Sequence, residues 1–271
     1  MDKIERLYNL KVIKSNNRLE VYKYQMPQRE GIKGHNNNGR KGSSGNGSLN
    51  KEAKEVNRKK VLYRARNEII RLIFCNPMST FITLTYKDVP DDLKQSKLDL
   101  RNFFIRLNKV YKGIKYLYVL EFGSLKGRLH YHVLCDISLP NDINFAKSRE
   151  KKSNQHKIYE NEFNNKFWQK GFIDIRDLNK EGISNISKYV ASYLAEDLIN
   201  LNLKGHRCYG YSQTLEKPIV EKLETKDNIL DLIELSQYDL KFISQYQINY
   251  KNKKNELIES DVHYFDYIKK D

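Results

Sequence analysis

Two strand-like runs separated by a short polar joint constrain this chain more than any other feature. The runs span Lys115 to Phe122 and Leu129 to Asp136, and the segment Gly-Ser-Leu-Lys-Gly-Arg, residues 123–128, joins them. Glycine, serine and charged residues between two apolar runs are typical of a hairpin turn. The sequence therefore predicts an antiparallel β-hairpin over residues 115–136.

The hairpin also predicts which residues face each other across its two strands. A turn centred on Leu125 and Lys126 places Glu121 directly opposite His130, with their Cβ atoms within about 5 Å. The same register pairs Val119 with His132 and Leu117 with Leu134. Because side chains two residues apart on a strand point the same way, both imidazoles and the carboxylate are expected on one face.

That face has the donor set of a catalytic metal site. Two imidazoles and one carboxylate, with positions left open for water and substrate, suit Mn²⁺ or Mg²⁺. Glu121 is the only acid in an otherwise hydrophobic run. A lone buried acid costs several kcal/mol unless it is paired or bound to metal. The competing interpretation is that His130 and His132 are structural, as two histidines on one strand often are.

The rest of the chain predicts an α+β sandwich, in which helices pack on a central antiparallel sheet. Residues 31–48 are rich in Gly, Asn and Ser and predict a flexible loop. The expected strands are 18–24, 81–86, 115–122, 129–136 and 172–175. The expected helices are 49–74, 93–111, 163–170 with Gly171 as C-cap, and 183–198, while 140–158 is expected to be a polar loop.

Net charge indicates the kind of partner. Lys and Arg exceed Asp and Glu by 49 to 34, which gives +15 at pH 7. Such an excess favours a nucleic acid, because neutralising phosphates releases condensed counterions. A lysine-rich proteome without a polyanionic partner is the alternative. Within the 49–74 helix, a solvated face and a DNA-backbone contact are both open for the basic residues Lys51, Lys54, Arg58, Lys59, Lys60, Arg64, Arg66 and Arg71.

Several classes of protein are disfavoured by what the sequence lacks. Three widely spaced cysteines, Cys75, Cys135 and Cys208, form no CxxC pair, which disfavours a zinc ribbon or a disulfide framework. No apolar signal core or membrane span is evident, so the cytoplasm is expected. The segment from Gly34, GHNNNGRK, lacks the Gly-Lys-Ser/Thr ending of a phosphate loop, so no nucleotide cofactor is expected.

The helix expected at 183–198 carries a pair of tyrosines one turn apart, Tyr189 and Tyr193. A packing stripe recurs every four residues beside them, at Ile186, Val190, Leu194 and Leu198. Tyrosines that flank a core stripe are commonly structural. A phenol near a divalent cation can instead lose its proton below its usual pKa of about 10 and attack a phosphodiester.

In order along the chain, these motifs resemble the HUH-endonuclease replication initiators, above all the rolling-circle replication-associated proteins of small single-stranded-DNA phages. FITLTY, residues 81–86, is similar to the first motif of that family, a strand near the DNA. GRLHYHVL with the upstream Glu121 resembles the metal strand, and YVASY, residues 189–193, resembles the nucleophile helix. Arg207-Cys-Tyr-Gly-Tyr-Ser212 is similar to a segment that follows it. The resemblance covers about residues 60–215.

The resemblance implies an HUH-like sandwich that nicks origin DNA. Glu121, His130 and His132 would hold the divalent metal. Tyr189 or Tyr193 would form a 5′-phosphotyrosine link and leave a free 3′-OH, with Tyr189 favoured as the first nucleophile. The strand would be rejoined at termination, and a host helicase and polymerase would act in the bacterial cytoplasm. Residues expected to contact DNA are Thr83, Thr85, Lys188, Arg58, Lys59, Lys60, Arg64 and Arg207.

One departure and two alternatives qualify this assignment. Many relatives have a lysine three residues after a motif-three tyrosine, whereas Ser192 and Glu196 occupy those positions here. A relaxase or transposase of the same fold, or a basic DNA-binding protein without catalysis, would share parts of the pattern. The expected organisation is an N-terminal extension over 1–48, a nicking domain over 49–215 and a C-terminal extension over 216–271.

Overall fold

The computed structural model describes residues 6–30, 51–88, 90, 92–122, 129–146, 150–179, 208–225, 235–251 and 257–270. The chain divides into two compact units. One unit, here the central unit, is residues 49–216. The other, here the terminal unit, combines residues 1–48 with residues 217–271.

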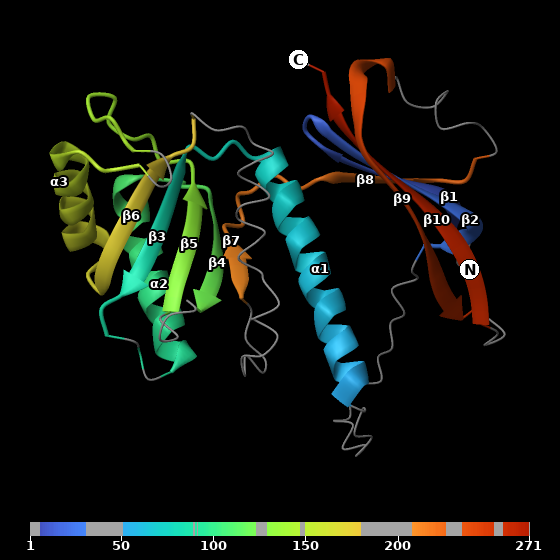
Figure 1. Ribbon diagram of the computed structural model, residues 1–271, viewed down its shortest axis with the longest axis horizontal. Coiled ribbons are helices and arrows are strands. Elements are labelled where there is room, and N and C mark those ends of the chain that lie inside the picture. The colour runs from blue at the N-terminus through green and yellow to red at the C-terminus, as the bar shows by residue number, and fades with distance from the viewer. Residues whose placement is uncertain are drawn as a thin grey trace, which may run out of the picture. The chain divides into compact units, whose positions relative to one another are not determined.

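A five-stranded antiparallel sheet forms the middle of the central unit, with strand order β6-β3-β5-β4-β7 (Figure 1). These strands are β3 (Thr80–Tyr86), β4 (Tyr116–Phe122), β5 (Leu129–Cys135), β6 (Gly171–Asp177) and β7 (Tyr209–Tyr211). β3 is the central-strand candidate of the sequence, and it lies between β6 and β5. Its β-branched and apolar residues suit a strand buried on both faces.

Helices cover both faces of this sheet. α1 (Lys51–Cys75) packs on one face through a cluster of buried residues that includes Ala65, Ile69, Leu72, Phe81, Leu117, Val119 and Leu134. α2 (Leu93–Val110) and α3 (Asn154–Phe163) pack on the opposite face with Ile82, Leu84, Phe103, Leu107, Tyr131, Phe163 and Trp168. The observed class is therefore α+β, as the sequence predicts.

The segment between β5 and β6 differs from the expectation. Residues 140–158 are expected to be loop and 163–170 helix, but α3 begins at Asn154 and continues into a π-helical turn, η1 (Asn164–Trp168). Gly171 is the first residue of β6 and not a helix C-cap; Gln169, at φ 64°, is the left-handed residue that ends η1. The Ser153 side chain caps α3 by accepting a hydrogen bond from the backbone N–H of His156.

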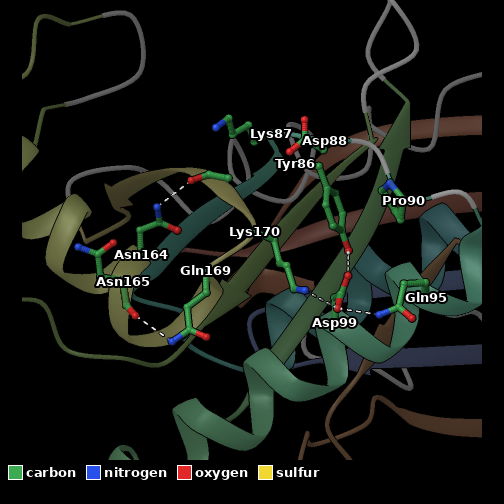
Figure 2. A pocket seen from close by; sticks show the side chains of 11 residues that line it. Tyr86, Lys87, Asp88, Pro90, Gln95, Asp99, Asn164, Asn165, Gln169 and Lys170 are labelled. Atoms are coloured by element: carbon green, nitrogen blue, oxygen red, sulfur yellow. Dashed lines mark hydrogen bonds and ion pairs between the residues drawn. The ribbon is translucent and has the colours of Figure 1, made fainter.

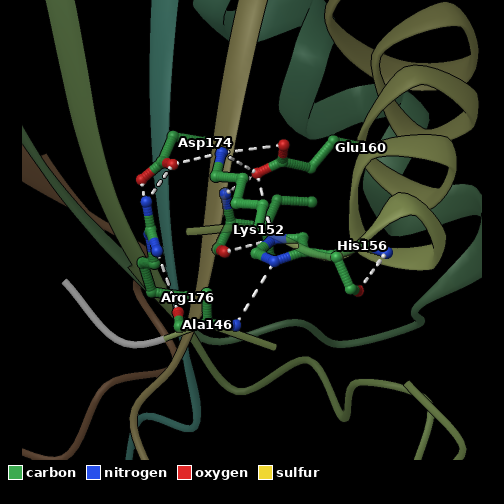
Figure 3. Close-up of polar contacts among 8 residues, drawn as sticks. Ala146, Lys152, His156, Glu160, Asp174 and Arg176 are labelled. Atoms are coloured by element: carbon green, nitrogen blue, oxygen red, sulfur yellow. Dashed lines mark hydrogen bonds and ion pairs between the residues drawn. The ribbon is translucent and has the colours of Figure 1, made fainter. Parts of the chain in front are cut away.

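Buried polar side chains of α3 satisfy the outer edge of β6 (Figure 3). Glu160 accepts a hydrogen bond from the backbone N–H of Ile175 at 2.7 Å, and His156 Nε2 donates to the Ile175 carbonyl at 3.0 Å. His156 Nδ1 accepts from the backbone N–H of Ala146, so the imidazole is held neutral. Accordingly, burial lowers the pKa of His156 below its usual range, against the raising effect of Glu160.

The terminal unit is a second five-stranded antiparallel sheet, with order β8-β1-β2-β10-β9. Its strands are β1 (Leu7–Ser15), β2 (Arg18–Arg29), β8 (Ile219–Leu223), β9 (Tyr238–Lys251) and β10 (Leu257–Lys269), with a 3-10 turn, η2 (Leu235–Gln237), before β9. Leu10, Val12, Leu19, Val21 and Tyr267 form its small core. The expected N- and C-terminal extensions are thus joined in one sheet by the β1–β8 and β2–β10 pairings.

Candidate metal centre

Three adjacent strands place the expected metal ligands on the α1 face of the central sheet. β4 and β5 pair with Glu121 opposite His130, Val119 opposite His132 and Leu117 opposite Leu134. This is the register that the hairpin turn predicts. On the other side of β5, Thr85 lies opposite His130 and Thr83 opposite His132. The site therefore consists of two rows of side chains above an apolar third row.

Threonine hydroxyls hold both imidazoles through the same ring nitrogen. Thr85 Oγ1 lies 2.9 Å from His130 Nδ1, and Thr83 Oγ1 lies 3.2 Å from His132 Nδ1. A hydroxyl can both donate and accept, so each contact persists whichever tautomer the ring adopts. The two rings are nearly parallel, 21° apart in plane, with centroids separated by 6.4 Å. Nε2 is consequently the nitrogen that each ring can offer to a metal ion.

His132 is also fixed from the side of the core and from the side of the acid. Its ring stacks on Phe81, with centroids 5.6 Å apart and planes 10° apart. Its Nε2 lies 2.5 Å from Glu121 Oε2. This hydrogen bond lowers the pKa of the Glu121 carboxyl below its ordinary value, against the raising effect of partial burial. Glu121 therefore stays ionised at neutral pH.

The donor set can be compared with the cation that the sequence implies. Among the described residues, no group of three or more His, Cys, Asp or Glu side chains has the arrangement of a metal site. The reason lies in the hydrogen bond from His132 to Glu121, because a cation would take the place of that bond. In donor chemistry the residues fit: two imidazole nitrogens and an ionised carboxylate, with both Nδ1 atoms held by hydroxyls, as metal-binding histidines require.

The structure brings further polar residues into these rows that the sequence did not single out. Asp174 of β6 lies opposite Thr83, and Tyr209 of β7 lies opposite Val119. Asp174 is paired with Arg176 at 2.7 Å and with Lys152, and Tyr209 donates to Glu68 of α1 at 2.6 Å. Their positions follow from strand order, which sequence alone did not predict for β6 and β7.

Other expected site residues fall in different parts of the chain. Lys59, Lys60 and Arg64 lie on α1 with exposed side chains, whereas only the backbone of Arg58 is described. Thr83 and Thr85, expected at the DNA, have hydroxyls bonded to the histidines. The two candidate nucleophiles Tyr189 and Tyr193, with Lys188 and Arg207, lie outside the described residues.

Known proteins resemble the part of the chain that carries these residues. Residues 79–198 match a family described as replication-associated protein ORF2. The matched range contains all three expected ligands and both tyrosines. The chain is also similar to the Replication-associated protein ORF2 of Spiroplasma virus 4, with 28% identity over 212 residues, which are 70% of this chain and 61% of that protein. No solved structure matches.

Both similarities support a replication-associated protein of phage type. The chain spans about 61% of the length of the viral relative, so the activity of the whole protein is inferred below from residues. In the part of the chain that the structure describes, no helix is both long and apolar enough to cross a membrane.

Proposed function

We propose that this protein is a replication initiator that nicks one strand of origin DNA by metal-assisted attack of a tyrosine. The observation that carries the proposal is the pairing of Glu121 with His130 and His132 on two adjacent strands, with threonines holding both rings. Mere DNA binding needs neither an ionised acid against two histidines nor oriented imidazoles. The +15 net charge suits a DNA substrate.

Glu121, His130 and His132 would hold a Mg²⁺ or Mn²⁺ ion, which supplies Lewis-acid polarisation of the scissile phosphate. The protein's own residues do the rest. Thr83 and Thr85 keep the two rings in place through Nδ1, and Phe81 keeps the His132 ring from turning. Such pre-positioning is what lets a site act without reorganising during the reaction.

The nucleophile of the proposed reaction is Tyr189, with Tyr193 as the second. In the step, the phenolic oxygen forms a bond to phosphorus and the bond from phosphorus to the 3′ oxygen breaks. The phenolic proton ends on that oxygen, giving a 5′-phosphotyrosine and a free 3′-OH. No bond energy is lost, so a second transesterification can rejoin the strand at termination. The 3′-OH would serve a host polymerase, and unwinding would fall to a host helicase.

The experiment that tests this function is cleavage of a supercoiled plasmid carrying the cognate origin, with Mn²⁺ or Mg²⁺ present. We expect nicking, abolition by EDTA and protein left attached to the 5′ end. Tyr189→Phe and Tyr193→Phe, singly and together, separate the two nucleophiles. An adduct that survives in the double variant would exclude this pair. Absence of cleavage with either ion would leave a DNA-binding protein without catalysis.

A further inference from the structure

A polar pocket of about 730 Å³ lies at the end of β3, on the opposite face of the sheet from the candidate metal centre (Figure 2). Tyr86, the last residue of β3, lines it together with Asp99 of α2 and Asn164 of η1. Thr85, one residue earlier, bonds His130 on the other face. Because successive side chains on a strand alternate, one strand end serves both sites.

The pocket is built by backbone features that hold its shape. Its wall turns through the π-helical segment η1 and the left-handed Gln169, and π-helical turns are rare and frequent at functional sites. A Cβ on Gly171 would lie less than 3.0 Å from the Thr85 carbonyl oxygen, so only glycine allows the chain to approach β3 this closely. A hydrogen bond from Lys87 N–H to the Lys170 carbonyl, 3.0 Å long, joins the two edges of the wall.

Hydrogen-bond acceptors are concentrated inside. Asp99 is only 5% exposed, and it accepts from the Tyr86 hydroxyl at 3.2 Å and from Gln95 Nε2 at 3.0 Å. Burial raises the pKa of Tyr86 well above its ordinary value, so this phenol remains a donor. Asn164 Nδ2 donates to the Gly171 carbonyl, while its Oδ1 is buried with no hydrogen-bond partner among the described residues.

Cationic groups lie among the same lining residues. Lys170 Nζ is 3.5 Å from Asp99 Oδ1 and about half exposed, and Lys87 is exposed. Inner acceptors with outer ammonium groups match a molecule that has N–H donors at one end and negative charge at the other. Carboxylates and amides are the groups that proteins use to read base edges, and lysines take phosphate. A nucleotide has both ends, and pockets of this size hold ligands of that size.

We infer that this pocket binds one unpaired nucleotide of the DNA strand, with its base against Asp99 and Asn164 and its phosphate against Lys87 and Lys170. The inference rests on the proposed function, since it places this nucleotide beside the strand that is cleaved. The pocket would thereby select a base near the nick, separately from the metal centre.

The test measures binding of fluorescent single-stranded homopolymers of about ten nucleotides, in EDTA so that no cleavage occurs. We expect Asp99→Asn to change the order of affinity among the four homopolymers, because it replaces an acceptor by a donor at the base edge. Lys87→Ala with Lys170→Ala should weaken all four alike and reduce the salt slope by about two. Lys109→Ala, an exposed lysine at the far end of α2, is the matched control and should do neither.

Two outcomes would overturn the inference. One is an unchanged order of affinities in Asp99→Asn and also in the milder Gln95→Ala, with circular dichroism showing both folded. The other is competition by free deoxynucleoside monophosphates for the pocket without binding of oligonucleotides, which would make it a site for free nucleotides. Failure of the proposed function shows differently, as wild-type protein that binds DNA with this base preference yet never cleaves it.

Discussion

Glu121 faces His130 across the β4–β5 pair, but its carboxylate bonds the other histidine, with Oε2 2.5 Å from His132 Nε2. The acid therefore reaches diagonally along the ladder and links the two rows of the site. A carboxylate that spans both histidines can reach a cation held between them with only a side-chain rotation. The backbone register, set by the hairpin, needs no change.

Replacing this acid tests its role as a ligand. Glu121→Gln keeps the size and can still contact His132, but it removes the negative charge. We expect nicking in Mn²⁺ to fall by at least about a hundredfold, since loss even of a residue that only orients a ligand costs up to that. Binding of single-stranded DNA should be nearly unchanged. Asp136→Asn, at the other end of the same hairpin, is the control and should nick normally; equal activity of both variants would contradict the assignment.

Thr83 and Thr85 separate an orienting role from direct DNA contact. Thr83→Val with Thr85→Val keeps both β-branched shapes and removes the hydroxyls that bond Nδ1. We expect about 10- to 100-fold weaker metal affinity, measured by titrating Mn²⁺ against nicking rate. DNA affinity in EDTA should stay the same, and the serine variants should restore metal affinity. A fall in DNA affinity alone would instead place these hydroxyls at the DNA.

The exposed basic residues of α1 are expected to bind phosphate. Replacing Lys59, Lys60 and Arg64 by alanine should weaken DNA binding evenly across sequences and lower the salt slope by up to about three. The measurement is fluorescence anisotropy over a range of salt concentrations. A triple alanine variant at Lys241, Lys269 and Lys270 of the terminal unit removes the same charge. If both triple variants weaken binding equally, α1 is not a specific contact.

His156 makes the central unit sensitive to acid. Its folded pKa lies below the unfolded value of about 6.5, chiefly through burial, so unfolding takes up a proton as the pH falls below that value. Its contribution to stability is present above pH 6.5 and is lost toward the folded pKa, at up to about 1.4 kcal/mol per pH unit. Carboxylates such as Asp174, whose pKa is lowered overall by Arg176 and Lys152 against the effect of burial, act only at lower pH.

Urea unfolding followed by the fluorescence of Trp168 measures this dependence in the central unit, because Trp168 is the only tryptophan and is fully buried there. We expect the free energy of unfolding to fall between pH 7 and pH 5. His156→Gln should be less stable at pH 7 but flatter over that interval, whereas His263→Gln, in the terminal sheet, should keep the wild-type slope. A wild-type profile flat from pH 7 to pH 5 would contradict the role of His156.

Gly171 should tolerate no side chain. Alanine there would place its Cβ less than 3.0 Å from both the Thr85 carbonyl oxygen and the Lys87 backbone nitrogen. We expect a loss of about 3 kcal/mol or more, since backbone atoms cannot move aside cheaply. Gly113→Ala is the comparison, because that residue has φ +74° but open space around it, and it should lose only about 1 kcal/mol. Similar losses at the two sites would argue against close approach at Gly171.

Local pattern was sufficient for the hairpin and for much of the site. The register of Glu121 with His130 followed from a turn between two runs of period two, and a shift of one residue would have exposed the apolar face. α3 was missed for a physical reason. Its buried face includes His156 and Glu160, which bond a strand edge, so no apolar stripe marks it in the sequence.

Pairing of distant segments was beyond local pattern. β1 and β8 are joined by Asn9, whose side chain bonds the backbone of Thr225, 216 residues away. Neither segment has a turn that would announce its partner, and the two ends were therefore interpreted as separate extensions. The same limit applies to Asp174 and Tyr209, whose place beside the site depends on which strands become neighbours of β3 and β4.

The shared terminal sheet has a consequence for how the protein is made. Arg18 of β2 makes two hydrogen bonds to Asp266 of β10, 2.9 and 3.0 Å long, across 248 residues of chain. β1 and β2 therefore leave the ribosome long before their partner strands exist, whereas the central unit is synthesised without interruption and can fold in the meantime. Translation order makes the sheet that joins the two ends the last part to assemble, and the early hairpin must avoid aggregation until then.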